Sequence, residues 1–130
     1  MSARAVVVHD DPEFCISLTV ALRVAGYEVA AYPHPLAALA ALNSARPIEL
    51  VLTRVRFPSG KGDGVSLALS ARYRRPDIKV LFLALPAFAE YVTGLGEFIA
   101  APAEIEGIVG TVRRLVAPYT LANALSQFAA

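Results

Sequence analysis

The chain has 130 residues, of which 56% are apolar and 18% charged, and its formal net charge at pH 7 is +1. This length suits a single domain, and the composition excludes a disordered chain, which would have few apolar and many charged residues. The near-neutral charge argues against a nucleic-acid-binding domain, which is usually strongly basic. The densest basic run, Arg72–Arg75, is therefore interpreted as the solvated end of a helix.

The sequence carries no signal for membrane insertion or secretion. No run reaches the ~20 apolar residues of a membrane span. The first four residues lead directly into an apolar strand, which leaves no room for a signal peptide. We therefore expect a cytoplasmic protein. The single cysteine, Cys15, excludes an internal disulfide, and its apolar neighbours indicate a buried small side chain rather than a reactive thiol.

The first half of the chain alternates short apolar runs with helix-like segments. The run Ala5–Val8 predicts a strand buried on both faces. Asp11 is a suitable N-cap and Pro12 suits the first turn of the helix that follows, which ends at Gly26. The apolar residues of this helix are Phe14, Ile16, Leu18, Val20, Leu22 and Val24. The next elements are a strand over Tyr27–Tyr32, a helix over Leu36–Leu42 and a strand over Ile48–Thr53.

The second half continues this alternation. After the loop at Pro58–Gly64, the pattern predicts a helix over Val65–Arg75, a strand over Val80–Leu85, a weak helical stretch over Ala87–Thr93 and a strand over Glu97–Ala100. The last helix begins at Pro102 and stops at Pro118, with apolar residues at helical spacing between them. The glycine-rich loop contains Lys61 but lacks the spacing and the Ser or Thr of a phosphate-binding Walker motif, so we interpret it as a connection.

This order of elements predicts the fold class. Alternating strands and helices form parallel βαβ units with right-handed crossovers, which gives a doubly wound α/β domain. For five strands we expect the order 2-1-3-4-5, with the functional site at the carboxyl edge between the first and third strands. Residues 1–118 form this domain. Residues 119–130 form a tail, with Leu121, Leu125 and Phe128 at helix-like spacing, that packs on the domain or on a partner.

Three stretches flank the predicted carboxyl edge: Val6–Glu13, Leu50–Pro58 with the later Asp63-Gly64, and Ala100–Pro102. Together they resemble the CheY-like receiver domain of bacterial two-component response regulators, over residues 4–117. The resemblance implies a flavodoxin-like fold and a role in phosphorelay signal transduction. In that family a histidine kinase phosphorylates an aspartate at the end of the third strand. An acidic pair after the first strand holds Mg²⁺ with that aspartate, and a Thr or Ser and a Lys contact the phosphoryl group.

The sequence departs from the receiver pattern at most of these positions. Arg54 aligns with the phospho-accepting aspartate, and its guanidinium has no nucleophilic oxygen and stays protonated. His9 and Asp10 align with the acidic pair, so that Asp10, with Asp11 beside it, is the surviving acid. The other departures are Ala84 at the hydroxyl position, Ala101 at the lysine position and Phe98, without a hydroxyl, at the switch aromatic of the fifth strand.

The substitution at Arg54 predicts an ion pair instead of a metal site. A fixed guanidinium opposes a divalent cation, so we expect no Mg²⁺, no other cofactor and no phosphorylation. Arg54 and Asp10 should face each other across the crevice, and Asp10 should titrate low. If Asp10 is deeply buried, removal of Arg54 would cost about 3–5 kcal/mol. The pair is either a structural salt bridge or a lock that holds one signalling conformation.

The predicted function is a pseudo-receiver, not an enzyme, that signals without phosphorylation through contacts with a histidine kinase or a downstream output protein. In the family, the face made by helix 4, strand 5 and helix 5 is the usual output and dimer surface. The short segment before the fifth strand trims this face and should expose Phe88, Tyr91 and Leu95, which the tail or a second copy would cover. The alternatives are a small-anion or metabolite sensor that uses Arg54 and a flavodoxin-like enzyme. The enzyme lacks support because the sequence shows no nucleophile–base pair and no cofactor loop.

Overall fold

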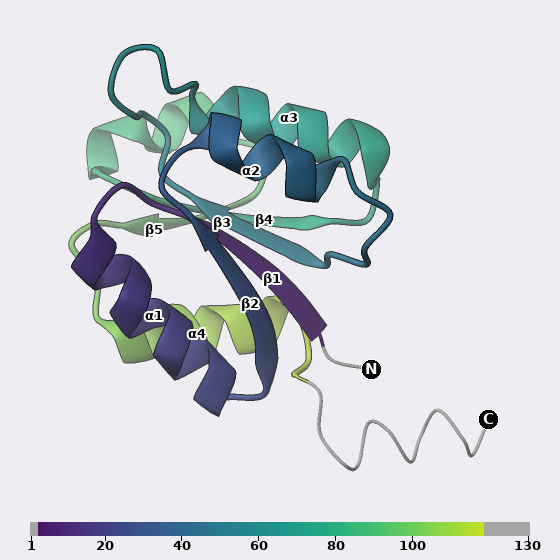
Figure 1. The fold of residues 1–130 in the computed structure, drawn as a ribbon. Coiled ribbons are helices and arrows are strands. Elements are labelled where there is room, and N and C mark those ends of the chain that lie inside the picture. Colours follow the sequence, from purple (N-terminus) through teal and green to yellow (C-terminus); the bar gives the residue numbers. More distant parts are fainter. Residues whose placement is uncertain (1–2, 119–130) are drawn as a thin grey trace.

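A five-stranded parallel sheet is the middle layer of the molecule (Figure 1). It is seen in a computed structural model that describes residues 3–118. All neighbouring strands pair in parallel, in the order β2-β1-β3-β4-β5, which confirms the doubly wound arrangement expected from the sequence. The strands are β1 (Ala3–Val8), β2 (Tyr27–Tyr32), β3 (Leu50–Thr53), β4 (Lys79–Ala84) and β5 (Glu97–Ala100).

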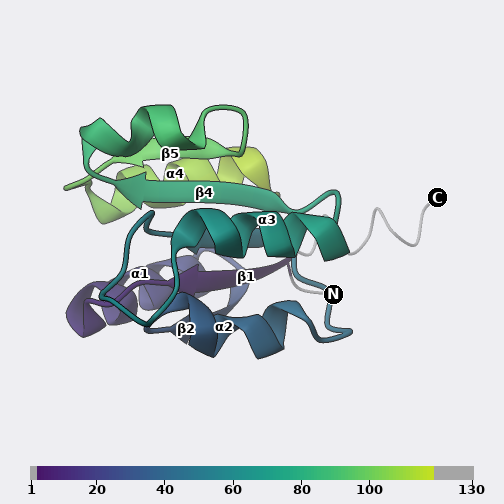
Figure 2. The same cartoon turned by 90° about the horizontal axis from the view of Figure 1, so that it is seen from above.

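Helices cover both faces of this sheet (Figures 1 and 2). One face packs against α1 (Pro12–Val24) and α4 (Ile105–Leu115). The other packs against α2 (Pro35–Leu42), α3 (Gly64–Arg74) and the 3₁₀ helix η1 (Pro86–Val92). None of the helices in the described part of the chain is both long and apolar enough to cross a bilayer. The tail predicted at residues 119–130 lies outside the described residues.

The inner strands are buried on both faces, which explains their nearly continuous apolar sequences. In β1, Val6 and Val8 enter the core on the α3 side, while Ala5 and Val7 enter the core on the α1 side. In β4, Phe82 is fully buried among the residues of the α3 side. The two core layers therefore hold β1, β3 and β4 rigidly, and the residues that follow these strands are well positioned.

Side-chain caps explain where α1 and α2 begin. The Asp11 carboxylate accepts hydrogen bonds from the backbone N–H groups of Glu13 and Phe14, and Pro12 occupies the first turn, as expected from the sequence. His34, which the sequence left without a role, caps α2 by accepting from the Ala37 N–H at 3.2 Å. The last helix begins at Ile105 and not at Pro102, because Glu104 is still in an extended conformation.

The basic run at the end of α3 is not fully solvated, which corrects the expectation for Arg72 and Arg75. Both side chains are half-buried and donate to carbonyl oxygens. Arg72 reaches Leu95 O at 2.6 Å and Ile78 O at 3.2 Å, while Arg75 reaches Leu42 O and Ser44 O at the end of α2. Through these bonds the two cations join the end of α3 to the segments before β4 and β5 and after α2, so they have a structural role.

The segment between β4 and β5 is a seven-residue 3₁₀ helix, η1, in agreement with the predicted shortening. Of the three apolar residues expected to be exposed there, only Tyr91 is largely accessible, at 64%. Phe88 and Leu95 are half-buried and pack against the core on the α3 side. The short connection therefore folds down onto the sheet instead of leaving a large apolar patch.

Candidate functional site

The candidate site lies where β1 and β3 end at the carboxyl edge of the sheet. Val8 and Thr53 are direct neighbours in the parallel register, so the residues that follow them emerge side by side. A hollow of about 350 Å³ lies above this edge. Its lining contains Leu83, Leu85 and six of the residues predicted from the sequence: His9, Asp10, Asp11, Arg54, Ala84 and Ala101.

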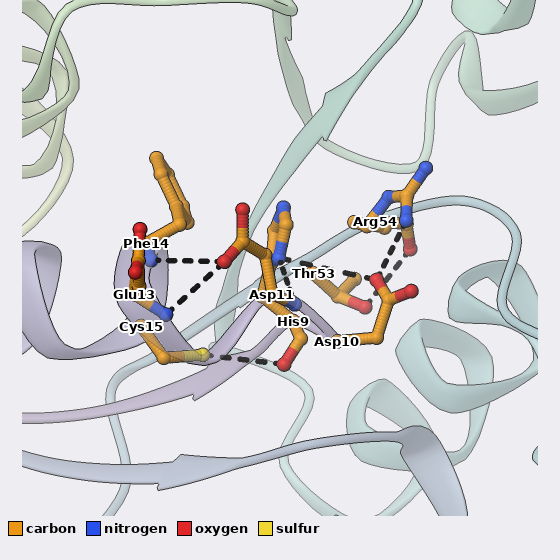
Figure 3. A network of polar contacts seen from close by, with 8 residues as sticks. All are labelled: His9, Asp10, Asp11, Glu13, Phe14, Cys15, Thr53 and Arg54. Carbon is orange, nitrogen blue, oxygen red and sulfur yellow. Dashed lines mark hydrogen bonds and ion pairs between the residues drawn. The ribbon is translucent and has the colours of Figure 1, made fainter.

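The predicted ion pair between Arg54 and Asp10 is present (Figure 3). Arg54 Nη1 donates to Asp10 Oδ1 at 2.6 Å, across the gap between the two strand ends. Partial burial acts to raise the Asp10 pKa, but the hydrogen bond and the positive charge of Arg54 outweigh it and hold the pKa below its ordinary value. The carboxylate of Asp10 is therefore ionised and paired at neutral pH.

The pair is less buried than a large energetic role would require. The Arg54 and Asp10 side chains keep 37% and 30% of their accessible surface. Water screens a pair of this exposure, so we expect it to contribute about 1 kcal/mol or less. Removal of Arg54 would cost about 3–5 kcal/mol only if Asp10 were deeply buried. Asp10 is not deeply buried, so this larger cost is not expected.

His9 is held by the start of α1. Its Nδ1 accepts a hydrogen bond from the Asp11 N–H at 3.0 Å, and its ring lies against the Phe14 ring with 4.5 Å between centroids. Burial and the nearby Arg54 charge lower the His9 pKa. His9 is thus neutral at pH 7, and its Nδ1, 3.9 Å from Asp10 Oδ1, makes no ion pair there.

Asp11 and Cys15 have structural roles beside the site. Asp11 is exposed, but its Oδ1 is occupied in capping α1. The half-buried Cys15 donates from Sγ to the His9 carbonyl at 3.2 Å, and burial raises the pKa of its thiol. This agrees with the expected unreactive side chain, because a thiol with a raised pKa is a poor nucleophile.

Two residues to which the sequence assigned no role, Thr53 and Gly64, fix the backbone of Arg54. The buried Thr53 hydroxyl donates to the Arg54 carbonyl oxygen at 2.9 Å. Gly64, at the start of α3, packs so closely that an added Cβ would lie 1.7 Å from that same oxygen. The Gly64 N–H also donates to Val55 O at 2.8 Å, which ties the β3–α3 loop back to the strand end.

Comparisons with known proteins identify the fold of the chain. No protein-family model and no curated protein sequence matches the chain. Among solved structures, Vibrio cholerae chemotaxis protein CheY4 is 21% identical, with a TM-score of 0.77 over 89% of this chain and 100% of that one. The HemR receiver domain from Leptospira biflexa is 25% identical, with a TM-score of 0.77 over 91% and 97% of the two chains.

A third solved structure, described as an adenylate cyclase from Rhodopirellula baltica, is 20% identical and has a TM-score of 0.80. It covers 98% of this chain and 97% of that one. The chain has the receiver fold. The structures thus confirm the CheY-like architecture expected from the sequence, including the strand order.

Within the receiver fold, the site of this chain has little capacity for metal binding. Residues 3–118 contain no group of three or more His, Cys, Asp and Glu side chains placed to hold a metal ion. Among the described residues, only two carboxylates, Asp10 and Asp11, line the hollow; each already uses one oxygen in a hydrogen bond, and the Arg54 guanidinium beside them opposes a divalent cation. The residues present therefore do not fit the Mg²⁺ of the phosphorylated receivers, which needs several free oxygen ligands.

The remaining receiver positions lack polar groups. Ala84 is buried at the end of β4, and Ala101 is half-buried after β5, joined to Pro102 by a cis peptide bond. Neither side chain can donate to a phosphoryl group. Phe98 lies outside the hollow and packs, half-buried, against the core on the α3 side.

The lowered pKa of His9 predicts a pH dependence of stability. The unfolded chain binds a proton at His9 more readily than the folded chain, so stability falls as pH drops below about 6.5, the ordinary histidine pKa. His9→Asn keeps an acceptor for the Asp11 N–H but does not titrate. We expect urea denaturation between pH 7.5 and 5 to give a shallower loss of stability for this variant than for the wild type, and equal slopes would contradict the assignment.

Proposed function

We propose that this chain is a pseudo-receiver, a domain of the receiver fold that signals without phosphorylation through contact with a protein partner. The observation that supports this most strongly is the 2.6 Å hydrogen bond from Arg54 to Asp10 at the edge where receivers carry out phosphoryl transfer. A guanidinium cannot attack phosphorus, and its charge is permanent.

Phosphoryl transfer depends on cations that neutralise the charge that develops in the transition state. In this chain the one cation among the lining residues, Arg54, is engaged with Asp10. The lysine position is occupied by Ala101 and the hydroxyl position by Ala84. The acceptor, hydroxyl and lysine positions are thus all substituted together. This supports a mechanism without phosphorylation over a receiver whose phosphorylation is only weakened.

We favour the interpretation of the Arg54–Asp10 pair as a lock. The positive charge of Arg54 takes the place of the metal ion beside Asp10, and the Arg54 backbone is pinned by Thr53 and closely packed against Gly64. The Arg54 side chain bonds to Asp10 after β1, and the Arg54 backbone is held at the end of β3, so the two strand ends are linked in one arrangement. The backbone contacts supply most of this restraint, because the exposed ion pair itself contributes about 1 kcal/mol or less. On this basis a partner, a histidine kinase or a downstream output protein, would recognise one permanent surface.

The charges of the hollow disfavour the alternative function of an anion sensor. The lining contains two carboxylates, Asp10 and Asp11, and one guanidinium, Arg54, and His9 is neutral at pH 7. The hollow therefore carries a net negative charge, which repels a small carboxylate or phosphate. No lining residue offers an activated nucleophile either, so an enzymatic role has no support from these groups.

A structural test uses beryllofluoride, which mimics a phosphoryl group bound to an aspartate. We expect the ¹H–¹⁵N NMR spectrum of the wild-type chain to stay unchanged when Mg²⁺ and beryllofluoride are added together. Saturable shifts of amide signals in the β3–α3 loop and at Ala84 would show that the site still binds the mimic, and the proposal would then fail.

A further inference from the structure

Helix α1 carries a row of exposed apolar side chains. Ile16, Val20 and Val24 are 65%, 55% and 85% exposed, and their four-residue spacing places them along one face of the helix. The opposite face holds Leu18 and Leu22, which are fully buried against the sheet. Ile and Val are weaker helix formers than Ala, Lys or Glu, and their side chains are apolar. At solvent-facing positions they therefore neither stabilise the helix nor interact well with water.

This row, which we call the α1 stripe, contains more exposed large apolar side chains than any other helix in residues 3–118. The other large exposed apolar residues are scattered over several elements: Leu36 on α2, Leu69 and Tyr73 on α3, Leu85 after β4, and Tyr91 on η1. The η1 side, where the trimmed dimer face was expected, thus offers less continuous apolar surface than α1. A row of this kind indicates an interaction surface.

We propose that the α1 stripe is the contact with a second copy of this chain, with the two α1 helices packed antiparallel about Val20. Three residues spaced evenly along a helix are symmetric about the middle one. Val20 then meets Val20 of the second copy, and Ile16 meets Val24 of the second copy. The contact is the same from both sides, so a two-fold axis closes the assembly as a dimer.

The charges of α1 favour the antiparallel direction. Glu13 lies in the first turn of the helix and Arg23 in its last turn. Both residues are exposed, although Arg23 Nη2 also donates to Val29 O at 3.0 Å. Antiparallel packing brings the acidic end of one helix toward the basic end of the other and opposes the two helix dipoles, whereas parallel packing brings like charges together.

A single helix face is a small interface. It buries less than the roughly 1,200 Å² typical of stable complexes, so we expect a weak dimer that forms at high protein concentration. The contact uses no residue of the Arg54 site. If the dimer does not form, the proposed phosphorylation-independent function is unaffected. If the chain proves to be phosphorylated, the proposed dimer contact is equally unaffected.

Disulfide trapping tests the register. In a Cys15→Ala background, Val20→Cys should form a covalent dimer under mild oxidation. A mixture of Ile16→Cys and Val24→Cys chains should give mainly the mixed dimer. Leu69→Cys, at an equally exposed position on α3, is the matched control and should cross-link far more slowly. If Ile16→Cys chains coupled mainly with each other, and Val24→Cys chains likewise, the antiparallel arrangement would be contradicted. Cross-linking of Leu69→Cys as fast as that of Val20→Cys would also contradict the proposal.

Sedimentation velocity over a concentration series provides the second measurement. Val20→Lys should weaken self-association at least tenfold relative to wild type, and Leu69→Lys should leave it unchanged. A wild-type chain that stays monomeric at every concentration, or a dimer that is lost only with Leu69→Lys, would overturn the proposal.

Discussion

Gly64→Ala should destabilise the domain by about 3 kcal/mol or more, because overpacking of a rigid position has effects at this upper end of the range. The new Cβ would lie 1.7 Å from the Arg54 carbonyl oxygen and 3.1 Å from Thr53 Oγ1. The neighbouring atom is backbone and cannot rotate away. The Gly64 N–H is bonded to Val55 O, so the loop cannot move without breaking that bond.

Equilibrium urea denaturation measures this loss, and Gly110→Ala is the matched control. Gly110 lies within α4, and an added Cβ there would meet no atom within 4 Å. We expect that control to stabilise the domain by about 0.5–1 kcal/mol, the usual gain when alanine replaces glycine in a helix. A Gly64→Ala variant as stable as the wild type would mean that α3 does not pack against the end of β3 in this way.

Arg54→Asp should convert the paired site into one that binds Mg²⁺. The substitution removes the cation and adds a carboxylate next to Asp10, with Asp11 nearby, and carboxylate oxygens are the ligands Mg²⁺ prefers. Without metal the variant should be less stable, because like charges repel. With Mg²⁺ at ten times its dissociation constant, stability should rise by about 1.4 kcal/mol through mass action.

Thermal unfolding with and without Mg²⁺ measures this gain. Arg56→Asp makes the same charge change two residues away, at an exposed side chain that lies over the Phe88 ring, outside the hollow. We expect neither this control nor the wild type to respond to Mg²⁺ beyond the general effect of salt. An equal response in all three proteins would show that Arg54 does not determine metal binding.

The sequence alone was sufficient for the strand order and for the meeting of Arg54 with Asp10. Both follow from chain-order rules, since the ends of β1 and β3 must lie side by side in a 2-1-3 arrangement. The burial of the Arg54–Asp10 pair could not be predicted from the sequence. Whether a charged pair is screened depends on how the loops after the strands close over it, and here they leave each side chain about one-third exposed.

Close contacts made by loops were also beyond sequence reasoning. The sequence pattern indicates only a flexible connection at Gly64, because the approach of this residue to the Arg54 carbonyl depends on the path of the β3–α3 loop. The roles of Arg72 and Arg75 depend in the same way on where distant carbonyl groups end up.

The α1 stripe, in contrast, has a clear signal in the amino-acid sequence. Apolar residues at every second position of a helix fall into two rows of four-residue spacing, on opposite sides. One row contains Leu18 and Leu22, and the other contains Ile16, Val20 and Val24. Only one row can enter the core of a helix packed on a sheet. The spacing of the second row is therefore enough by itself to predict exposed apolar surface on this helix.

The most direct test of the central claim is the intact mass of the wild-type chain after incubation with acetyl phosphate and Mg²⁺. With Arg54 paired to Asp10 at the acceptor position, the mass should remain that of the unmodified protein at every time point. A stable gain of one phosphoryl group, lost when Asp10 or Asp11 is replaced by Asn and kept when the distant Asp77 is replaced, would contradict a phosphorylation-independent receiver fold.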